Sequence, residues 1–357
     1  MLACGPWSAS ISAGGPVAAI LVDDRVVAVG TNPLESGRVG ESWAIAVDAC
    51  QGEPVAGAQP WAAARAQIRG AALFQQTVYV TGTVAEPAGI FISRLSKTDL
   101  SIQHEDTLVL AVPEPRVHAA VAAPSGVWLA GSSATTAWAA KTDGNGACPI
   151  LLNESATSVQ VAVAGDSVWV AASDGHALLL FETNDASCNT TSCGCSTQPG
   201  IEAQLPAGLV DLDVLSVAAD ASHVYVAGSA GIGSAKRGVL LELAPSGAVQ
   251  KLLELDLAPG PDEVVATLLL EGALYAAINT QVDSAQDART VLRRYPLPLA
   301  DAPATDVVLG AFRAASISAG PDGDVVIAGD ASGGASLFRC DSAGICSASP
   351  MPSPMPP

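Results

Sequence analysis

The sequence is poor in charged and in aromatic side chains. Of its 357 residues, 14% are charged and 4% are aromatic, whereas 49% are hydrophobic. Because disordered chains combine low hydrophobicity with high charge, this composition excludes a largely disordered protein and favours a packed core. Alanine, valine and glycine must supply much of that packing. The length suits one large domain or two to three ordinary ones.

Basic residues and long apolar runs are also scarce. Lys and Arg number 16 against 35 Asp and Glu, a formal net charge of −19, which repels nucleic acids and anionic membranes. No apolar run reaches the roughly 18 residues that a membrane-spanning helix needs. The N-terminal MLACGPW also lacks the basic and apolar regions of a complete signal peptide. We therefore expect no nucleic-acid partner and no transmembrane segment.

Recognisable catalytic motifs are missing. The four histidines are far apart in the chain, and neither Gly-x-Ser-x-Gly nor His-Glu-x-x-His occurs. These motifs would place a nucleophile on a sharp turn or two zinc ligands on one helix face. The sequence thus gives no residue to which catalysis can be assigned and implies no cofactor.

What the chain does contain is a repeated segment, seen as SHVYVAG, SGVWLAG and QTVYVTG. The residues that end its seven occurrences are Gly30, Gly82, Gly131, Ala172, Gly228, Ile278 and Gly329. Their separations range from 41 residues (Gly131 to Ala172) to 56 residues (Ala172 to Gly228). A period in this range is typical of repeat architectures.

Each repeat predicts four short β-strands. An apolar run precedes the repeated segment across a Gly, Asp, Pro or Ser turn, which is typical of a β-hairpin. A third run follows, as in GIFISRL, and a weaker fourth, as in TLVLAVP. We therefore expect an all-β, seven-bladed β-propeller of four-stranded antiparallel blades as a single domain over residues 1–347, before a Pro-rich tail at 348–357. Residues 5–13 should supply the outer strand of the seventh blade and close the ring as a latch, while two β-sandwiches are the rival fold.

The repeat resembles that of a known family. Segments such as QTVYVTGTVAEPAGIFISRLSKTD, SGVWLAGSSATTAWAAKTDGNG and SHVYVAGSAGIGSAKRGVLLELAPSG are similar to the seven-bladed β-propeller repeat of secreted bacterial proteins. In that repeat, G-N-V-Y-V-T-G is followed by a variable loop and F-V-A-K-L-D-x-x-G. The resemblance covers most of the chain and is weakest around Ile278. It implies the fold and an exported setting (secreted, periplasmic or cell-surface), and no activity.

The eight cysteines form an even set, which favours an oxidising compartment. They are Cys4, Cys50, Cys148, Cys188, Cys193, Cys195, Cys340 and Cys346. All are expected on one face of the ring, the bottom, which carries the turns between third and fourth strands. Cys340 and Cys346 should bridge a tight turn, and Cys148 should take one cysteine of the SCNTTSCGC cluster while the other two pair.

Two further cysteine assignments stay open. Cys4 is expected to pair with Cys50, but a small residue before Cys4 also fits a lipid anchor. Zinc bound by the cluster together with Cys148 is an alternative to disulfides.

Polar residues of the innermost strands and blade linkers are candidates for a binding site at the mouth of the central channel, on the opposite, top face. They are Arg69, Arg116, His118, Asp213, Glu263 and Arg313. Arginines there would favour an anionic group, whereas Asp211, Asp213, Asp262 and Glu263 could hold calcium. The longest top-face loops are expected over residues 31–42, 229–238 and 279–289, and long loops often carry function.

The sequence as a whole predicts an exported, non-enzymatic binding or scaffold module. We expect a monomer that contacts a protein or glycan partner through its top-face loops. The alternative is a hydrolase or lyase with its site at the top of the central channel, because propellers of one shape carry many functions.

Overall fold

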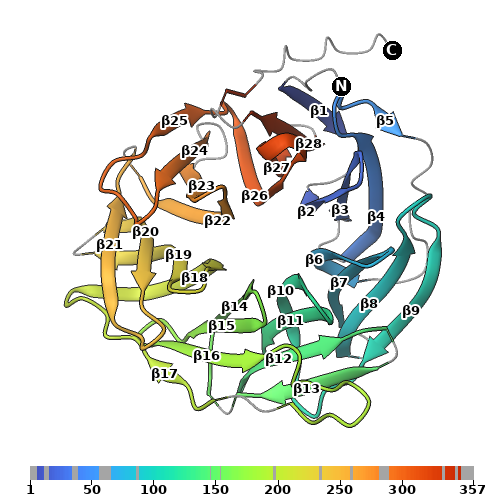
Figure 1. The fold of residues 1–357 in the computed structure, drawn as a ribbon, viewed down its shortest axis with the longest axis horizontal. Coiled ribbons are helices and arrows are strands. Elements are labelled where there is room, and N and C mark those ends of the chain that lie inside the picture. The colour runs from blue at the N-terminus through green and yellow to red at the C-terminus, as the bar shows by residue number, and fades with distance from the viewer. Residues whose placement is uncertain are drawn as a thin grey trace.

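The chain folds into a ring of seven sheets, each with four antiparallel strands (Figure 1). The computed structural model describes residues 6–11, 16–33, 39–55, 66–85, 88–144, 146–152, 154–195, 198–232, 235–257, 260–280, 289–331, 334–341 and 345–346. The predicted seven-bladed β-propeller is thereby confirmed, and the rival pair of β-sandwiches is wrong. The Pro-rich tail at 348–357 lies outside the described residues.

The strand numbers increase from the axis of the ring outward in every blade, except that the outer strand of the seventh blade is β1. The innermost strands are β2 (Pro16–Val22), β6 (Ala66–Phe74), β10 (Arg116–Ala123), β14 (Ser158–Ala164), β18 (Leu209–Ala219), β22 (Asp262–Leu270) and β26 (Phe312–Ala319). The second strands are β3 (Arg25–Pro33), β7 (Thr77–Ala85), β11 (Gly126–Ser132), β15 (Ser167–Ser173), β19 (Val224–Ile232), β23 (Ala273–Thr280) and β27 (Val325–Ala331).

The outer half of each blade follows the same order. The third strands are β4 (Val39–Asp48), β8 (Ala88–Ser96), β12 (Ala137–Thr142), β16 (Leu178–Asn184), β20 (Ala235–Leu243), β24 (Arg289–Pro296) and β28 (Gly334–Cys340). The outer strands are β5 (Pro54–Val55), β9 (Ile102–Leu108), β13 (Ala147–Leu151), β17 (Ile201–Glu202), β21 (Val249–Leu255), β25 (Thr305–Val308) and β1 (Trp7–Ile11). A short 3-10 turn, η1 (Pro321–Gly323), joins β26 to β27.

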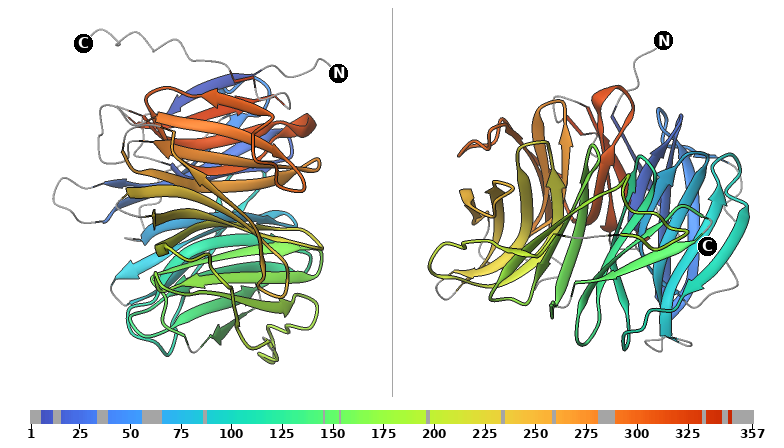
Figure 2. Two further views of the ribbon diagram at one scale, coloured as in Figure 1. Left: turned by 90° about the vertical axis from the view of Figure 1, so that its left-hand side faces the viewer. Right: turned by 60° about the horizontal axis from the view of Figure 1, so that its bottom comes forward.

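The core is divided into seven apolar clusters, each built by two adjacent blades. Neighbouring sheets stack face to face around the ring (Figure 2). The middle strands are therefore covered on both faces, and every residue of β11 and β12 is buried. This explains why the repeated segments are continuous apolar runs instead of alternating with polar residues.

The seventh blade combines the two ends of the described chain. β1 pairs antiparallel with β28, so that Trp7 lies opposite Arg339 and Ile11 opposite Ala335. One of the seven clusters likewise joins this blade to the first, through Val326 and Val26. Residues 5, 12 and 13 of the predicted latch lie outside the described residues.

The expected top-face loop over 229–238 is wrong. β19 and β20 stay paired along nearly the whole segment, from Ser229 opposite Gly238 to Ile232 opposite Ala235. In the loop expected over 31–42, residues 31–33 and 39–42 are strand, because Thr31 pairs with Ser42 and Pro33 with Val39, and residues 34–38 lie outside the described residues. Cross-strand pairing satisfies backbone groups that a loop would leave to solvent. For the loop expected over 279–289, residues 281–288 lie outside the described residues.

Two predicted cysteine pairings can be compared with the structure. Cys340 and Cys346 form the expected disulfide. Within the cluster, Cys188 and Cys195 are bonded to each other, whereas Cys148 and Cys193 are free thiols. The prediction that Cys148 forms a disulfide with one of the cluster cysteines is therefore wrong. Cys50 is disulfide-bonded, and its predicted partner Cys4 lies outside the described residues.

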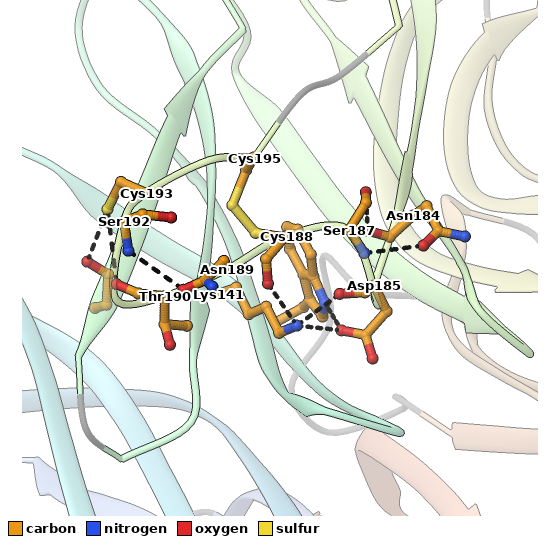
Figure 3. Close-up of a disulfide and its surroundings, with 12 residues drawn as sticks. Lys141, Asn184, Asp185, Ser187, Cys188, Asn189, Thr190, Ser192, Cys193 and Cys195 are labelled. Atoms are coloured by element: carbon orange, nitrogen blue, oxygen red, sulfur yellow. Dashed lines mark hydrogen bonds and ion pairs between the residues drawn. A yellow bond between two sulfur atoms is a disulfide. The ribbon is translucent and has the colours of Figure 1, made fainter.

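Blades three and four are fastened together by a buried ion pair (Figure 3). Lys141 Nζ of β12 lies 3.0 Å from Oδ1 of Asp185, which directly follows β16, and both side chains are almost fully buried. Oδ2 of Asp185 also accepts from the backbone N–H and the hydroxyl of Ser125, each at 2.8 Å. A buried charge pair of this kind is tolerable because every partner is satisfied.

Candidate binding site at the axis of the ring

Two inner strands carry an extra residue at the same position. The pairing of β6 with β7 shifts between Ile68 and Gly70, and that of β10 with β11 shifts between Val117 and Ala119. Arg69 and His118 are the extra residues of these β-bulges, and a bulge re-aims its side chain. The pairing shifts at the corresponding position in four further blades, where the extra residues are Val17, Leu215, Val265 and Ala315. Polar side chains at the bulge thus belong to blades two and three.

The glycine that ends most repeated segments makes room for this bulge. A Cβ added to Gly131 would overlap the carbonyl oxygen of Arg116, and one added to Gly82 would overlap the carbonyl of Gln67. In the fourth blade, where Ala172 replaces the glycine, the pairing of β14 with β15 has no shift. The repeat pattern therefore specifies where the inner strand kinks, although β22 keeps its shift opposite Ile278.

His118 is held as a neutral imidazole between blades three and four. Its Nε2 lies 3.0 Å from the hydroxyl of Ser132, and its Nδ1 accepts from the backbone N–H of Val159 at 3.4 Å. Burial lowers the pKa of His118 to about 4, with Arg69 and Arg116 acting in the same direction and Asp213 opposing them. Because Nδ1 accepts a hydrogen bond, the proton of the neutral ring belongs on Nε2.

Arg69 and Arg116 bring two positive charges together beside this histidine. The pKa of Arg69 is lowered, first by the protein around its guanidinium and then by the charge of Arg116, although both residues are exposed to solvent. Across the described part of the chain, neither guanidinium lies within 4 Å of a carboxylate. Guanidinium groups are suited to binding an anion, because each can donate two parallel hydrogen bonds to a carboxylate or phosphate.

The structure brings four of the six candidate residues together. Asp213 of β18 is close enough to act on the pKa of His118, so Arg69, Arg116, His118 and Asp213 form what we call the axial cluster. Glu263 is not part of it and pairs with Lys236 at 3.2 Å. Arg313 is not among the charges that act on the pKa of His118 and lies opposite Asp330, whose pKa is raised because burial outweighs the charge of that arginine.

Two of the four acidic residues considered for calcium have other partners. Oδ2 of Asp262 accepts a 2.7 Å hydrogen bond from the N–H of Leu257, and Glu263 is paired as described. Throughout the described ranges, no group of three or more His, Cys, Asp or Glu residues is arranged to hold a metal ion. Nor does any helix of that part of the chain have the length and apolarity to cross a membrane.

Hydroxyl groups that sequence reasoning passed over fasten the inner strands to each other. Ser216 and Thr267 are 2.9 Å apart across blades five and six, and the N–H of Ala19 donates to Ser316 Oγ at 3.1 Å across blades one and seven. Both serines directly follow a bulged residue. The position after the bulged residue could have been found in the sequence, because the other bulged blades carry a small residue there as well, namely Ala18, Gly70, Ala119 and Ala266.

Chemically, the axial cluster suits binding better than catalysis. Both ring nitrogens of His118 are engaged, and a pKa of about 4 makes the imidazole a poor proton carrier at neutral pH. The two arginines cannot act as bases, but each presents donors in a planar fork that matches a carboxylate or phosphate.

Comparison with known structures supports the fold. Similar structures include hydrazine synthase of Kuenenia stuttgartiensis, with 12% identity and a TM-score of 0.64 over 94% of this chain and 98% of that one. The β-propeller domain of the trilobed protease of Pyrococcus furiosus shares 8% identity, with a TM-score of 0.57 over 96% and 97% of the two chains. YCF48 bound to the D1 peptide shares 11% identity, with a TM-score of 0.52 over 94% of each chain.

These similarities define the class of protein, a seven-bladed β-propeller. At such low identity they show the fold alone, and the functions named for these proteins differ from one another. No family model matches this chain, and no curated protein does.

Proposed function

We propose that this protein is an exported, non-enzymatic binding module that holds a carboxylate of a protein partner at its axial cluster. The observation that carries the proposal is the pair of unpaired, mutually repelling guanidiniums of Arg69 and Arg116. An anionic group between them would relieve that repulsion and gain charge-assisted hydrogen bonds. Export is supported by the disulfides Cys188–Cys195 and Cys340–Cys346, because such bonds persist in oxidising compartments.

A protein partner is favoured over a glycan. Sugar recognition draws on aromatic faces, and the aromatic residues of the repeats, such as Tyr79, Trp128 and Tyr225, are buried. YCF48 is a propeller described with a bound peptide, which agrees with a peptide ligand here by fold analogy. A monomeric state and a lipid anchor at Cys4 remain expectations. The hydrolase or lyase alternative gains no support from His118, whose nitrogens are both occupied.

Fluorescence anisotropy with three labelled decapeptides of equal length tests the proposal. One ends in a free carboxylate, a second is amidated and otherwise uncharged, and a third is amidated with two internal glutamates. Arg69→Ala and Arg116→Ala should each weaken binding about tenfold or more, since hydrogen bonds to charged groups contribute about 1.5–3 kcal/mol. Binding of the first peptide alone identifies a chain terminus as the ligand, and binding of the third identifies acidic side chains.

Arg313→Ala is the matched control. Arg313 occupies in β26 the place that Arg116 occupies in β10, two residues before the bulge, but it faces Asp330 in place of a second arginine. Its removal should change the affinity less than twofold. Equal affinities for wild type, Arg69→Ala and Arg116→Ala, or equal binding of the uncharged peptide, would rule the site out.

A further inference from the structure

Two free thiols lie against each other on the bottom face, where blade four meets blade three. Cys148 belongs to β13, opposite Lys141 of β12, and its side chain is buried. Cys193 belongs to the segment that follows β16 of the next blade, and its side chain is exposed. The Sγ of Cys193 lies 3.8 Å from the carbonyl oxygen of Ala147, the residue directly before Cys148 (Figure 3).

The segment that carries Cys193 is fastened to blade three by residues that precede Cys193 in the chain. Lys141 Nζ donates to the carbonyl oxygens of Asp185 and Cys188 at 2.6 and 2.9 Å. The hydroxyl of Thr190 donates to Oδ2 of Asp143 at 2.6 Å. The Cys188–Cys195 disulfide closes the segment into a loop that contains Cys193. The position of Cys193 beside Cys148 is thus fixed by contacts that do not depend on either thiol.

The two thiols differ in accessibility, because Cys148 is buried and Cys193 is exposed. Burial raises the pKa of Cys148 to about 11, with hydrogen bonding to Cys193 and the charge of that thiol adding to the effect. A buried thiol of this kind is unreactive toward reagents in solution, whereas an exposed thiol meets them directly. An oxidant must therefore reach Cys193 first, and Cys148 can act only as the resolving thiol.

We propose that Cys148 and Cys193 form a redox-active dithiol that closes to a cross-blade disulfide when it meets a small disulfide such as oxidised glutathione. The thiolate of Cys193 attacks one sulfur of glutathione disulfide, breaking its S–S bond, and the first glutathione leaves as a thiolate. Cys148 then loses its proton and attacks Sγ of Cys193, and the second glutathione leaves. Two protein thiols are oxidised by two electrons, one glutathione disulfide is reduced to two thiols, and the two protons from cysteine end on them.

The closed form would join β13 of blade three covalently to the segment after β16 of blade four. It links residues 45 positions apart in sequence, so it restricts the unfolded chain strongly. This inference does not depend on the ligand proposed for the axial cluster, which lies at the other end of the blades.

The test equilibrates the full-length protein in glutathione buffers from reduced to oxidised, quenches it with N-ethylmaleimide and maps the peptides by mass spectrometry. Oxidised buffers should yield a Cys148–Cys193 linked peptide, with Cys188–Cys195 and Cys340–Cys346 unchanged. Closure should raise Tm by roughly 5 °C.

Two single variants separate the roles of the thiols. Cys148→Ser should stop at a glutathione adduct on Cys193, because the resolving thiol is missing. Cys193→Ser should leave Cys148 free and unlabelled until the protein is denatured. The proposal is overturned if wild type also stops at the adduct, if both thiols stay free in oxidised buffer, or if Cys193 is found linked to Cys188 or Cys195.

Discussion

The indole Nε1 of Trp128 donates a 2.8 Å hydrogen bond to Oδ1 of Asp185, which belongs to the next blade. Trp128 lies opposite Lys141 in the sheet, and the same carboxylate pairs with that lysine. One acidic side chain thus connects the second and third strands of blade three with the segment after β16. Trp128, the aromatic residue of the repeated segment, and Lys141, on the following strand, therefore both bind the carboxylate of Asp185.

Asp185→Asn should destabilise the protein by about 3–5 kcal/mol. Burial alone would raise the pKa of Asp185, but hydrogen bonds from Trp128, Ser125 and Lys141 outweigh it and lower that pKa. The amide would leave the ammonium of Lys141 buried without its counter-charge, which costs this amount in other buried pairs. Urea unfolding measures the change. Asp306→Asn, which breaks the more exposed pair with Arg293, is the control and should cost less than about 1 kcal/mol.

The stability of the protein should fall as the pH drops from about 6.5 toward 4 through His118. The folded-state pKa of about 4 lies below the ordinary histidine value, so in this window the unfolded chain binds a proton that the folded protein does not. The loss is on the order of 2–3 kcal/mol and is complete below about pH 4. His118→Gln cannot titrate, and its stability should vary less with pH over this window. Parallel pH profiles for the two proteins would contradict the assignment.

Arg116→Ala should stabilise the unliganded protein slightly at low salt. The substitution removes the positive charge that lowers the pKa of Arg69, and with it a like-charge repulsion. The gain in Tm should disappear near 1 M salt, where the screening length is about 3 Å. Thermal unfolding at two salt concentrations measures it. A lower Tm at both would mean that Arg116 has a structural contact that outweighs the repulsion.

Gly131→Ala should destabilise the third blade by about 1–3 kcal/mol, because a methyl group there overlaps the carbonyl of Arg116 and opposes the bulge. Gly146→Ala serves for comparison. A Cβ added to Gly146 would lie 3.4 Å from the carbonyl oxygen of Thr190, which is close to ordinary contact, so the change in stability should be small. Denaturant unfolding of both variants provides the measurement, and equal destabilisation would show that the glycine is not required by the bulge.

Much of the ring could be read from the chain because the signals are local. The turn between two apolar runs and the small residue at Gly131 or Gly228 are set by neighbours in sequence. The sequence also placed Arg69 and His118 correctly on inner strands. The loop predicted over residues 229–238 was wrong, because Gly and Ser residues suggest a loop even where the pairing of β19 with β20 holds them in a hairpin.

The candidate site depended on distances that no local pattern records. Arg69, His118 and Asp213 come from blades two, three and five, and a one-residue shift in each inner strand decides where their side chains point. The sequence predicted Glu263 at the same site as Asp213, but in the structure Glu263 forms an ion pair with Lys236. The pairing of Cys188 with Cys195, which leaves Cys193 beside Cys148, was likewise left open by spacing alone.

By itself, the sequence determined the number of blades and their strand order, since each repeat carries its own turns and apolar runs. The tertiary structure decided which polar groups meet. Closure of the ring brings residues many positions apart together. Buried charges must then be paired, as for Lys141 with Asp185, whereas the exposed Arg69 and Arg116 have no carboxylate within 4 Å among the described residues. Burial costs a charge far more than exposure does, so only the folded ring could make that selection.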